Sequence, residues 1–411
     1  MLQLTFLLHV FFHLTDINAT FVMLNDVEMD TPFVYDNHVT GKNFVGRKTE
    51  CVVLSNLLEA GENVCLYETP KAGKTSLVQQ TLYNMRAAGK QFMVAYVDLL
   101  NVRSRRMFLK KLGGSVIRAA FSTPSDYSSV IAKHLAGTHF VFDPAQFASK
   151  EDIVCMNWDP DETDILEMTL LPQRIAEEKG MPLYVVFRDF QNVMQTEDYE
   201  AVFSTMEKAF AGRDRSASVK SAFIFCGSMV NAMKYIFAEK KYFYRQVNHL
   251  PLSPIDDRDA VEHIVRGFRS GGKVIERDLA LGACKLFRSE MWYLNQFFSI
   301  CDSMSKGFIN EAILVDALNS MIAVHEPRFK VLVNDLTDHQ LSLLRAVLDG
   351  VVKFSASDVI ERYGLNSSAN VRRVKDALRK KEILTFNEKD EPVILDPLFE
   401  YWVSKYYFEI Q

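Results

Sequence analysis

The chain has 411 residues, 48% of them hydrophobic and 24% charged, and its formal net charge is −5 at pH 7. This composition is typical of a globular protein with two or three domains and a large core, and it excludes a disordered or low-complexity chain. The negative net charge provides no general attraction to nucleic acid, so a contact with DNA would need a local basic face.

The N-terminal region is apolar, and the first Lys or Arg is Lys42. A secretory signal begins with positive charge and ends at a small-residue cleavage site, and residues 2–14 have neither. The run is also too short and too interrupted by polar residues to span a bilayer. We therefore expect residues 1–40 to be a leader or extended segment outside the fold, with Met23 or Met29 as the true start. A weak signal or membrane anchor is the alternative.

The central part of the chain alternates apolar strand-like runs with helical patterns. The expected strands are residues 64–67, 92–98, 182–187, 221–226 and 248–252, and the expected helices include 49–60, 75–88, 103–121 and 199–211. These strands are apolar almost throughout, which is typical of strands buried on both faces of a parallel sheet. The alternation predicts a doubly wound α/β domain. Residues 122–165 are irregular and are expected to form a solvated insertion, with a lid or partner loop as the alternative.

The most informative segment is residues 64–82, in which a short strand, a polar loop ending in Gly73-Lys74-Thr75 and a helix follow one another. This order matches the phosphate-binding pattern GxxxxGK[ST], except that Glu68 replaces the first Gly. The loop N–H groups and the helix N-terminus attract a polyphosphate, Lys74 reaches its β- and γ-phosphates, and the Thr75 hydroxyl can hold Mg²⁺. A chance GKT at a helix start is the alternative. The residues predicted to bind the nucleotide here are Thr69, Pro70, Lys71, Ala72, Gly73, Lys74, Thr75 and Ser76.

Helical patterns replace strands after Asp256, and Pro327 with residues 329–335 is expected to form a linker. The last part of the chain fits three helices and a hairpin, which is the plan of a winged helix-turn-helix. Its helices are expected at residues 336–348, 355–363 and 370–381, and its hairpin at 383–395. The predicted domains are a P-loop domain at residues 41–253, a helical lid at 254–330 and a winged helix at 331–411.

The six cysteines are scattered and include no CxxC pair; they are Cys51, Cys65, Cys155, Cys226, Cys284 and Cys301. Cys65 and Cys226 lie in apolar strand-like runs, which favours buried reduced thiols over disulfides or zinc ligands. We therefore expect a cytoplasmic protein with no membrane partner.

The chain resembles the STAND/AAA+-like ATPases of the archaeal ATPase family over about residues 40–405. Beside the P-loop, the resemblance rests on residues 44–50, similar to the family's Phe-x-Gly-Arg-x-x-Glu box, and on a third strand that ends Arg188-Asp189-Phe190-Gln191. It implies an α/β P-loop NTPase with an AAA+/STAND-like parallel sheet, followed by a helical lid and a winged-helix domain. It also implies ATP rather than GTP as the nucleotide, with Gly46 and Arg47 flanking the adenine.

The resemblance implies roles for residues at the strand ends. Asp189 stands at the position of the residue that activates the attacking water, with a helix N-cap or a surface acid as the alternative. Ser228 stands at the position of a sensor of the γ-phosphate, with a strand-ending turn as the alternative. Arg188 stands where the family has a metal-associated aspartate, and a cation beside Mg²⁺ is electrostatically unfavourable. Either metal binding is weakened, or Asp98 at the end of the second strand serves together with Thr75.

Further resemblances lie later in the chain. Tyr242-Phe243-Tyr244-Arg245 is similar to an aromatic stretch ending in Arg, so that Arg245 is a candidate arginine finger in cis or in trans. A solvated basic face is the alternative. Glu290-Met291-Trp292-Tyr293 matches a lid segment that commonly begins His-Pro, so any nucleotide contact from the His is lost, whereas Trp292 and Tyr293 are expected to pack. Residues 396–402 resemble a closing packing motif of the family.

Residues 355–381 carry seven cations against three anions, which gives the third helix of the winged helix a positive face. DNA and a protein partner remain equally open as its target. The residues expected to make this contact are Arg372, Arg373, Lys375 and Arg379.

The function predicted from these features is an ATP-dependent molecular switch with Mg²⁺ as cofactor, in which the winged helix relocates with the γ-phosphate state. Weak ATP hydrolysis accompanies this role. The alternatives are a nucleotide-binding scaffold without turnover, favoured by Glu68 and Arg188, and a DNA-binding regulator acting through the winged helix. STAND-type ATPases often assemble, so a homo-oligomer is open, although the sequence shows no interface.

Overall fold

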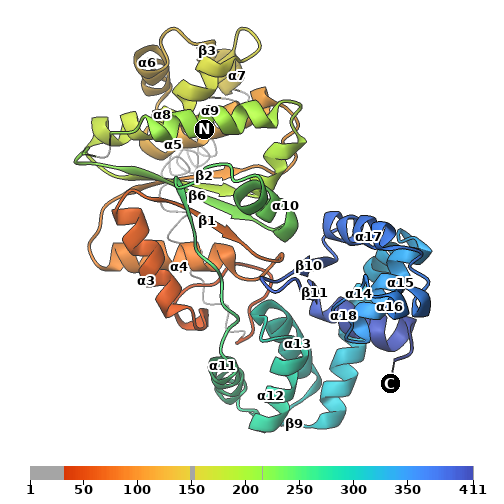
Figure 1. Ribbon diagram of the computed structural model, residues 1–411. Helices are drawn as coiled ribbons and strands as arrows, with labels where there is room; N and C mark the ends of the chain where they lie inside the picture. Colours follow the sequence, from red (N-terminus) through yellow and green to blue (C-terminus); the bar gives the residue numbers. More distant parts are fainter. Residues whose placement is uncertain (1–31, 149–152, 215, 411) are drawn as a thin grey trace, which may run out of the picture.

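The structure is a computed structural model that describes residues 32–148, 153–214 and 216–410. Its centre is a five-stranded parallel sheet with the strand order β2-β5-β6-β1-β7 (Figure 1). The strands are β1 (Asn63–Tyr67), β2 (Met93–Asp98), β5 (Leu183–Arg188), β6 (Ser221–Gly227) and β7 (Val247–His249). Each lies within a few residues of its predicted range, so the predicted parallel α/β sheet is confirmed.

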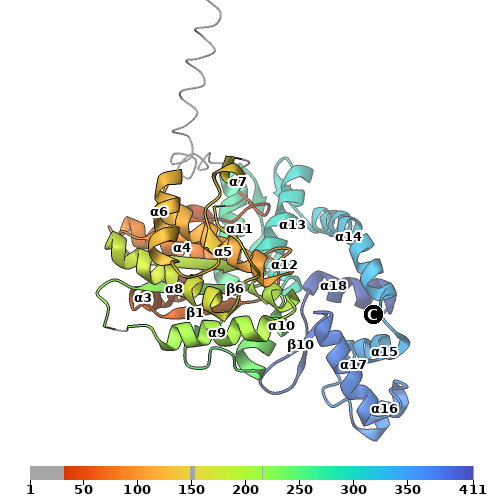
Figure 2. The same cartoon turned by 90° about the horizontal axis from the view of Figure 1, so that it is seen from above.

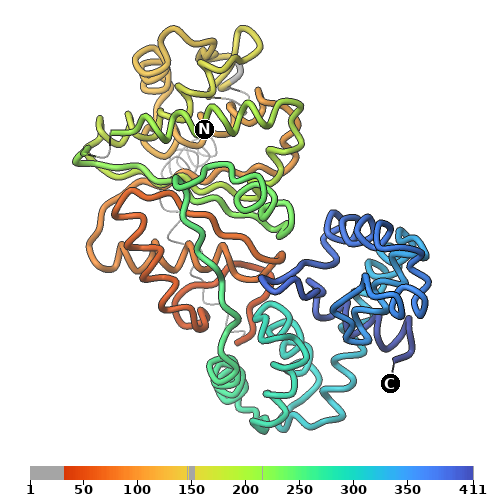
Figure 3. Tube along the Cα trace, viewed as in Figure 1, coloured from red at the N-terminus to blue at the C-terminus, as the bar shows by residue number. Residues whose placement is uncertain are grey.

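Helices cover both faces of this sheet. Helices α3 (Lys48–Glu59) and α4 (Lys74–Ala87) lie on one face, and α5 (Arg105–Ala120), α8 (Glu162–Lys179) and α9 (Tyr199–Ala211) lie on the other (Figures 1 and 3). Strand side chains alternate between the two cores: Val64 and Leu66 pack with the first pair of helices, whereas Cys65 packs with the second group. Because both faces are covered, these strands needed no polar alternation, which is why their sequences are apolar almost throughout.

The segment between α5 and α8 is more ordered than predicted. It contains α6 (Pro124–His134), the strands β3 (Phe140–Val141) and β4 (Cys155–Met156), which pair antiparallel, and the short helix α7 (Pro144–Ala148). The prediction of an irregular insertion was therefore wrong. The sequence does carry the start signal of α6, because Thr123 and Asp126 form a reciprocal capping box around Pro124.

The lid is helical, as predicted. It consists of α11 (Asp257–Ser270), α12 (Arg277–Leu286), α13 (Met291–Met304), the first half of α14 (Glu311–Asn334) and the paired two-residue strands β8 (Val274–Ile275) and β9 (Phe308–Ile309). The predicted linker was wrong, because α14 continues through Pro327. A proline costs one helical hydrogen bond, and here the burial of Phe329 and Val333 beyond it offsets that cost.

Residues 32–40 belong to the fold, contrary to the prediction that they lie outside it. The Phe33 side chain is 2% exposed and packs against Phe268 and Phe298 of the lid. Further along, the Val39 N–H donates to Ser76 Oγ on α4 at 3.1 Å. We call residues 32–45 the strap, since they join the lid to the P-loop helix. Residues 1–31, with both proposed start sites, lie outside the described residues.

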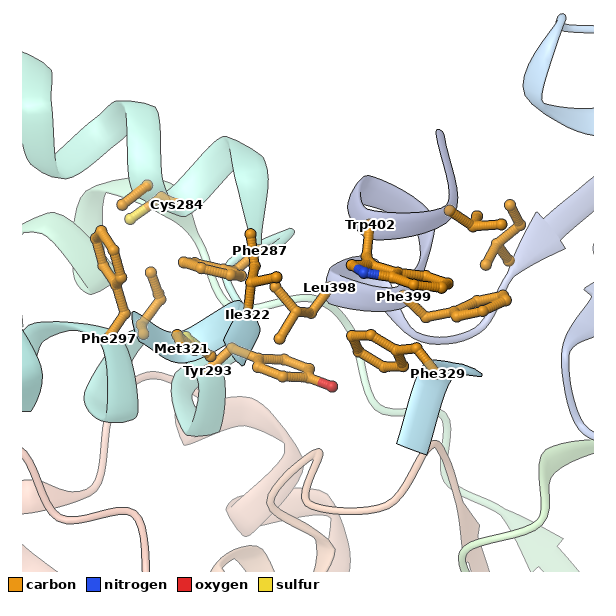
Figure 4. Packing of buried hydrophobic residues seen from close by; sticks show 14 of the residues in the cluster. Cys284, Phe287, Tyr293, Phe297, Met321, Ile322, Phe329, Leu398, Phe399 and Trp402 are labelled. Carbon is orange, nitrogen blue, oxygen red and sulfur yellow. The ribbon is translucent and has the colours of Figure 1, made fainter. Parts of the chain in front are cut away.

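The winged helix has its predicted three helices and hairpin. They are α15 (Asp338–Leu348), α16 (Ser357–Arg362), α17 (Ser368–Lys380) and the antiparallel strands β10 (Leu384–Phe386) and β11 (Pro392–Ile394), followed by α18 (Pro397–Trp402) and the π-helical turn η4 (Val403–Tyr407). The lid and winged helix share one hydrophobic core, in which Leu398 lies between Phe287 and Phe329, and Phe399 packs against the ring of Phe329 (Figure 4). The closing motif therefore packs as predicted.

All six cysteines are buried and none forms a disulfide. Burial raises the pKa of the Cys65 and Cys226 thiols to about 12, so both are protonated at neutral pH. Within the described ranges, no helix is both long and apolar enough to cross a bilayer.

Candidate nucleotide site

The loop between β1 and α4 has the geometry of a phosphate-binding loop. It leaves the carboxyl end of a central strand, and α4 begins at Lys74 directly after Gly73. Gly73 has φ +88°, a left-handed conformation that any residue with a Cβ would adopt only under strain. The free N–H groups of the first turn of α4 therefore point toward the space in front of the loop, where an anion is stabilised.

Lys74 is the most buried charged group of this loop, with 9% of its surface exposed. Its ammonium group donates to the carbonyl oxygens of Glu68 and Thr69, both at 2.7 Å. Burial lowers the pKa of Lys74 to about 8. A polyphosphate in front of the loop would raise this pKa again and offer oxygen acceptors in place of the two carbonyls.

Glu68 replaces the usual glycine, and its carboxylate accepts a hydrogen bond from the Thr69 N–H at 3.0 Å. The side chain therefore folds onto its own loop and forms part of its wall. It places a negative charge near the phosphate position, which weakens anion binding unless a cation offsets it.

Arg47 is the cation that faces this charge. It follows Gly46, and both residues have left-handed backbones, with φ of 53° at Arg47 and 66° at Gly46. The guanidinium Nη1 would lie 3.7 Å from a Cβ on Gly73. Its Nε and Nη1 atoms are buried and have no hydrogen-bond partner among the described residues, and the Thr69 hydroxyl in the loop is in the same state. Buried donors without acceptors are costly, so this arrangement fits an anionic ligand.

A cavity of about 230 Å³ opens beside the loop, between the P-loop domain and the lid. The strap, the P-loop, residues 252–255 and the start of α13 form its walls. Lys71 closes one side, because its ammonium group lies 3.3 Å from the centre of the Trp292 ring. The predicted residues that line the cavity are Arg47, Thr69, Lys71, Ala72, Gly73 and Ser76, whereas Gly46 packs near Ile255 and positions Arg47.

Trp292 and Tyr293 have different surroundings. Tyr293 packs, as predicted, with its ring stacked on Phe287 and its hydroxyl donating to Asp396 at 2.7 Å. Trp292 is only partly buried and lines the cavity, so packing is not its whole role. A flat aromatic surface at the mouth of the cavity suits a base or another planar group.

Asp189 and Ser228 are brought together at the carboxyl edge of the sheet, from the neighbouring strands β5 and β6. The Ser228 hydroxyl donates to Asp189 Oδ1 at 2.5 Å. Gln191, which is 4% exposed, donates to Asp189 Oδ1 at 3.2 Å and to Ser228 Oγ at 3.3 Å. The sequence reasoning assigned no role to Gln191, although a polar residue just after a buried strand was the available signal. The three residues form one polar group beside the P-loop.

Asp98 does not join this group. It ends β2, which lies three strands from β1 in the sheet order. Strands lie about 4.8 Å apart, so the end of β2 is about 14 Å from the end of β1. The prediction that Asp98 serves with Thr75 as a metal ligand was therefore wrong. Arg188 ends β5, the strand next to β2, and its guanidinium carbon lies 5.6 Å from the centre of the Tyr96 ring.

Arg245 lies at the opposite edge of the sheet. The next residue, Gln246, accepts at its carbonyl a hydrogen bond from Asn63 at the amino end of β1, whereas the P-loop leaves the carboxyl end. The prediction that Arg245 is an arginine finger in cis is therefore wrong, because the length of β1 separates Arg245 from the P-loop. Arg245 is exposed, and a role in trans remains a prediction.

The predicted basic face of the winged helix is partly used within the chain. Arg379 forms an ion pair with Glu239 of the P-loop domain, and Lys375 pairs with Asp390 of the hairpin at 3.2 Å. Together with Arg372 they line a cleft of about 1020 Å³ between the two domains. In this conformation the third helix therefore faces the P-loop domain, as Figure 2 shows for α17 and α10 (Val230–Lys234).

Glu290 is a site residue that the sequence reasoning set aside. It is mostly buried and borders three cavities, where the P-loop, the lid and the winged helix meet. Burial raises its pKa to about 8, and the carboxylates of Asp396 and Glu68 act in the same direction. The sequence signal for Glu290 was its position, because Glu290 stands where the family resemblance predicts a histidine.

Comparison with known proteins agrees with this architecture. A family model described as a probable winged helix domain matches residues 327–405. The structure is similar to the Walker-type ATPase of Pyrococcus abyssi, with a TM-score of 0.61 at 15% identity over 90% of this chain and 99% of that one. The fold is that of a P-loop ATPase with a C-terminal winged helix.

A second similar structure is the ORC2 protein of Aeropyrum pernix in its ADPNP–ADP complexes. Its TM-score is 0.52 at 15% identity, over 89% of this chain and 93% of that one. No curated protein sequence matches the chain. At these identities the likeness concerns the fold, and function has to be argued from the site.

Proposed function

We propose that this protein binds ATP at the P-loop and acts as an ATP-dependent switch whose output is the winged helix. The observation that carries the proposal is that Arg47 and the loop residue Thr69 have buried donors with no acceptor among the described residues, beside a lysine that is already in place. The ADPNP and ADP complexes of the Aeropyrum pernix protein, which has the same fold, support a nucleotide as the ligand.

Separate residues bind the phosphates, cover the base and orient the attacking water. Lys74, the loop N–H groups and Arg47 hold the phosphates, and Trp292 covers the base side of the cavity. Asp189, oriented by Ser228 and Gln191, accepts a hydrogen bond from the attacking water. Adenine rather than guanine rests on the family resemblance alone.

The residues present fit Mg²⁺ less well than they fit the nucleotide. The Thr75 hydroxyl is available as a ligand, but Asp98 is too distant and Arg188 places a cation at the end of β5. When bound, the metal would neutralise phosphate charge. Because one customary ligand is missing, we expect turnover to be weak, and a nucleotide-binding scaffold without turnover is the second candidate function.

Exposed arginines are the proposed contacts to partners. Arg372 and Arg373 are exposed on α17 and are the cations best placed to meet DNA or a protein, although Arg372 borders the closed cleft. Arg245 is exposed, and its proposed role is a contact in trans if the chain forms a homo-oligomer. A cytoplasmic location is part of the same proposal, since the buried thiols suit a reducing compartment.

The test measures ATP binding by calorimetry and phosphate release at steady state, each with and without Mg²⁺. The full chain is compared with Lys74→Ala and with the control Lys90→Ala, which removes an exposed lysine paired with Glu59. Binding that disappears only in Lys74→Ala supports the proposal. Absence of binding in the unaltered chain would overturn it, and tight binding without turnover would select the scaffold.

A further inference from the structure

The short helix that follows Ser228 is held by the winged helix. The turn between α17 and β10 carries Glu382. Its Oε1 accepts hydrogen bonds from the backbone N–H groups of Asn231 at 2.9 Å and Ala232 at 3.0 Å. These are N–H groups of the first turn of α10, which have no partner within the helix. A carboxylate at this position gains both hydrogen bonds and a favourable interaction with the helix dipole.

Four further contacts close the same junction. The Asn231 side chain, 6% exposed, donates to the carbonyl oxygens of Arg379 at 3.0 Å and Leu384 at 2.8 Å. One turn later, Lys234 donates to the Thr385 hydroxyl at 2.8 Å. The ion pair between Arg379 and Glu239 lies at the far end of the π-helical turn η3 (Tyr235–Glu239). Polar contacts therefore hold the segment 230–239 against the winged helix from its first turn to its last residue.

This segment is directly joined to the polar group of the candidate site. Ser228 lies three residues before Asn231, and its N–H and hydroxyl are both engaged, by Gln191 at 3.3 Å and by Asp189 at 2.5 Å. A shift of Ser228 toward a phosphate would move the first turn of α10, because only Met229 and Val230 lie between them. The N–H groups that Glu382 accepts from would then lose their alignment, since hydrogen bonds weaken steeply with angle.

The same contacts limit which side of α17 is accessible to a partner. Its residues Val371, Arg372 and Lys375 border the cleft toward the P-loop domain. A large partner cannot meet that side of α17 until the winged helix swings away from α10. The closed position is therefore an inhibited position of the output helix.

We infer that Glu382 is a latch that holds the winged helix closed on α10, and that the nucleotide state, read at Ser228, releases it. This inference rests on the proposed function, because it names the contact through which the nucleotide site controls its output. A ligand shifts such an equilibrium only by its different affinity for the two states, and here the difference arises at the Ser228–α10 turn.

The first experiment compares the full chain with Glu382→Ala and with Glu388→Ala, an exposed carboxylate in the turn of the same hairpin. Alanine is a matched change at position 382, since its φ of 53° is equally unfavourable for Glu and Ala. Hydrogen exchange of the segment 230–239 and the radius of gyration from X-ray scattering are measured without nucleotide. We expect exchange in this segment to be about tenfold faster and the particle larger in Glu382→Ala only. Unchanged exchange and size in Glu382→Ala would overturn the latch.

A charge exchange tests the junction from both sides. Glu239→Arg and Arg379→Glu each place like charges together and are expected to open the protein, whereas the double variant restores the pair and the compact size. If the double variant stays as open as the single variants, the ion pair does not hold the junction and the inference fails. This comparison is independent of the Glu382 variants, so a folding defect in one of them leaves it intact.

Nucleotide binding by calorimetry on the same samples separates the two proposals. ADPNP is expected to speed exchange in the segment 230–239 of the unaltered chain and to leave Lys74→Ala unchanged. If ADPNP binds but exchange does not respond, the latch is not coupled to the nucleotide and the inference fails while the proposed binding stands. If ADPNP does not bind, the proposed function fails, and with it the coupling that the inference names.

Discussion

Glu290 provides the sharpest quantitative prediction. It precedes α13, is mostly buried, and faces carboxylates of Asp396 and Glu68 as well as the cations of Arg288 and Lys74. Burial raises its pKa from the ordinary value of 4.5 to about 8, so folding has to keep the carboxyl neutral or bear the cost of its charge.

The sign of the pH dependence follows from linkage. Below pH 4.5 the carboxyl is protonated in both the folded and the unfolded chain, so it costs no stability. As the pH rises toward 8 the unfolded chain ionises first, and the free energy of unfolding falls. Each pH unit between the two pKa values costs about 1.4 kcal/mol, so the loss between pH 6 and pH 8 is about 2–3 kcal/mol. Partial exposure to water makes this an upper value.

The assay is urea unfolding followed by tryptophan fluorescence at pH 6, 7 and 8, since Trp292 and Trp402 report on the lid and the winged helix. Glu290→Gln cannot ionise, so its stability relative to the unaltered chain should increase by about 2 kcal/mol between pH 6 and pH 8. Glu276→Gln removes an exposed carboxylate in the same domain and should leave the pH dependence unchanged. Parallel stability curves for the unaltered chain and Glu290→Gln would refute the reasoning.

Three further predictions concern the site and the strap. Arg47→Ala should weaken nucleotide binding about 10- to 100-fold in calorimetry, because hydrogen bonds to a charged group contribute about 1.5–3 kcal/mol; equal affinity would show that Arg47 does not face the ligand. Arg188→Asp should raise steady-state phosphate release and its dependence on Mg²⁺, if the cation is what suppresses turnover; an unchanged rate would exclude that explanation. Phe33→Ala should lower the free energy of unfolding by about 3–5 kcal/mol in urea titrations, because the ring fills the lid core; a loss below about 1 kcal/mol would mean that the strap is not part of the fold.

The sequence by itself determined what depends on short separations along the chain. The P-loop is an example, since β1, the loop and the start of α4 occupy consecutive residues from Asn63 to Lys74 and need no distant partner to be recognised. The apolar strands and the winged-helix hairpin are local patterns of the same kind. In each case the period and the turn residues specify the element before tertiary contacts form.

Only the tertiary structure decided which of these elements meet. Strand order placed Asp98 about 14 Å from β1, and no local pattern encodes strand order. Arg245 comes directly before β7, which is parallel to β1, and it therefore lies at the amino edge of the sheet, opposite the P-loop. Burial of Phe329 kept α14 helical through Pro327, and a lid core completed by Phe33 brought the strap into the fold. Glu382 reaches Asn231 across 151 residues, so its role follows from docking of the winged helix rather than from its own sequence. Local propensity acts over a few residues, whereas the site is assembled by packing between segments that are distant in the chain.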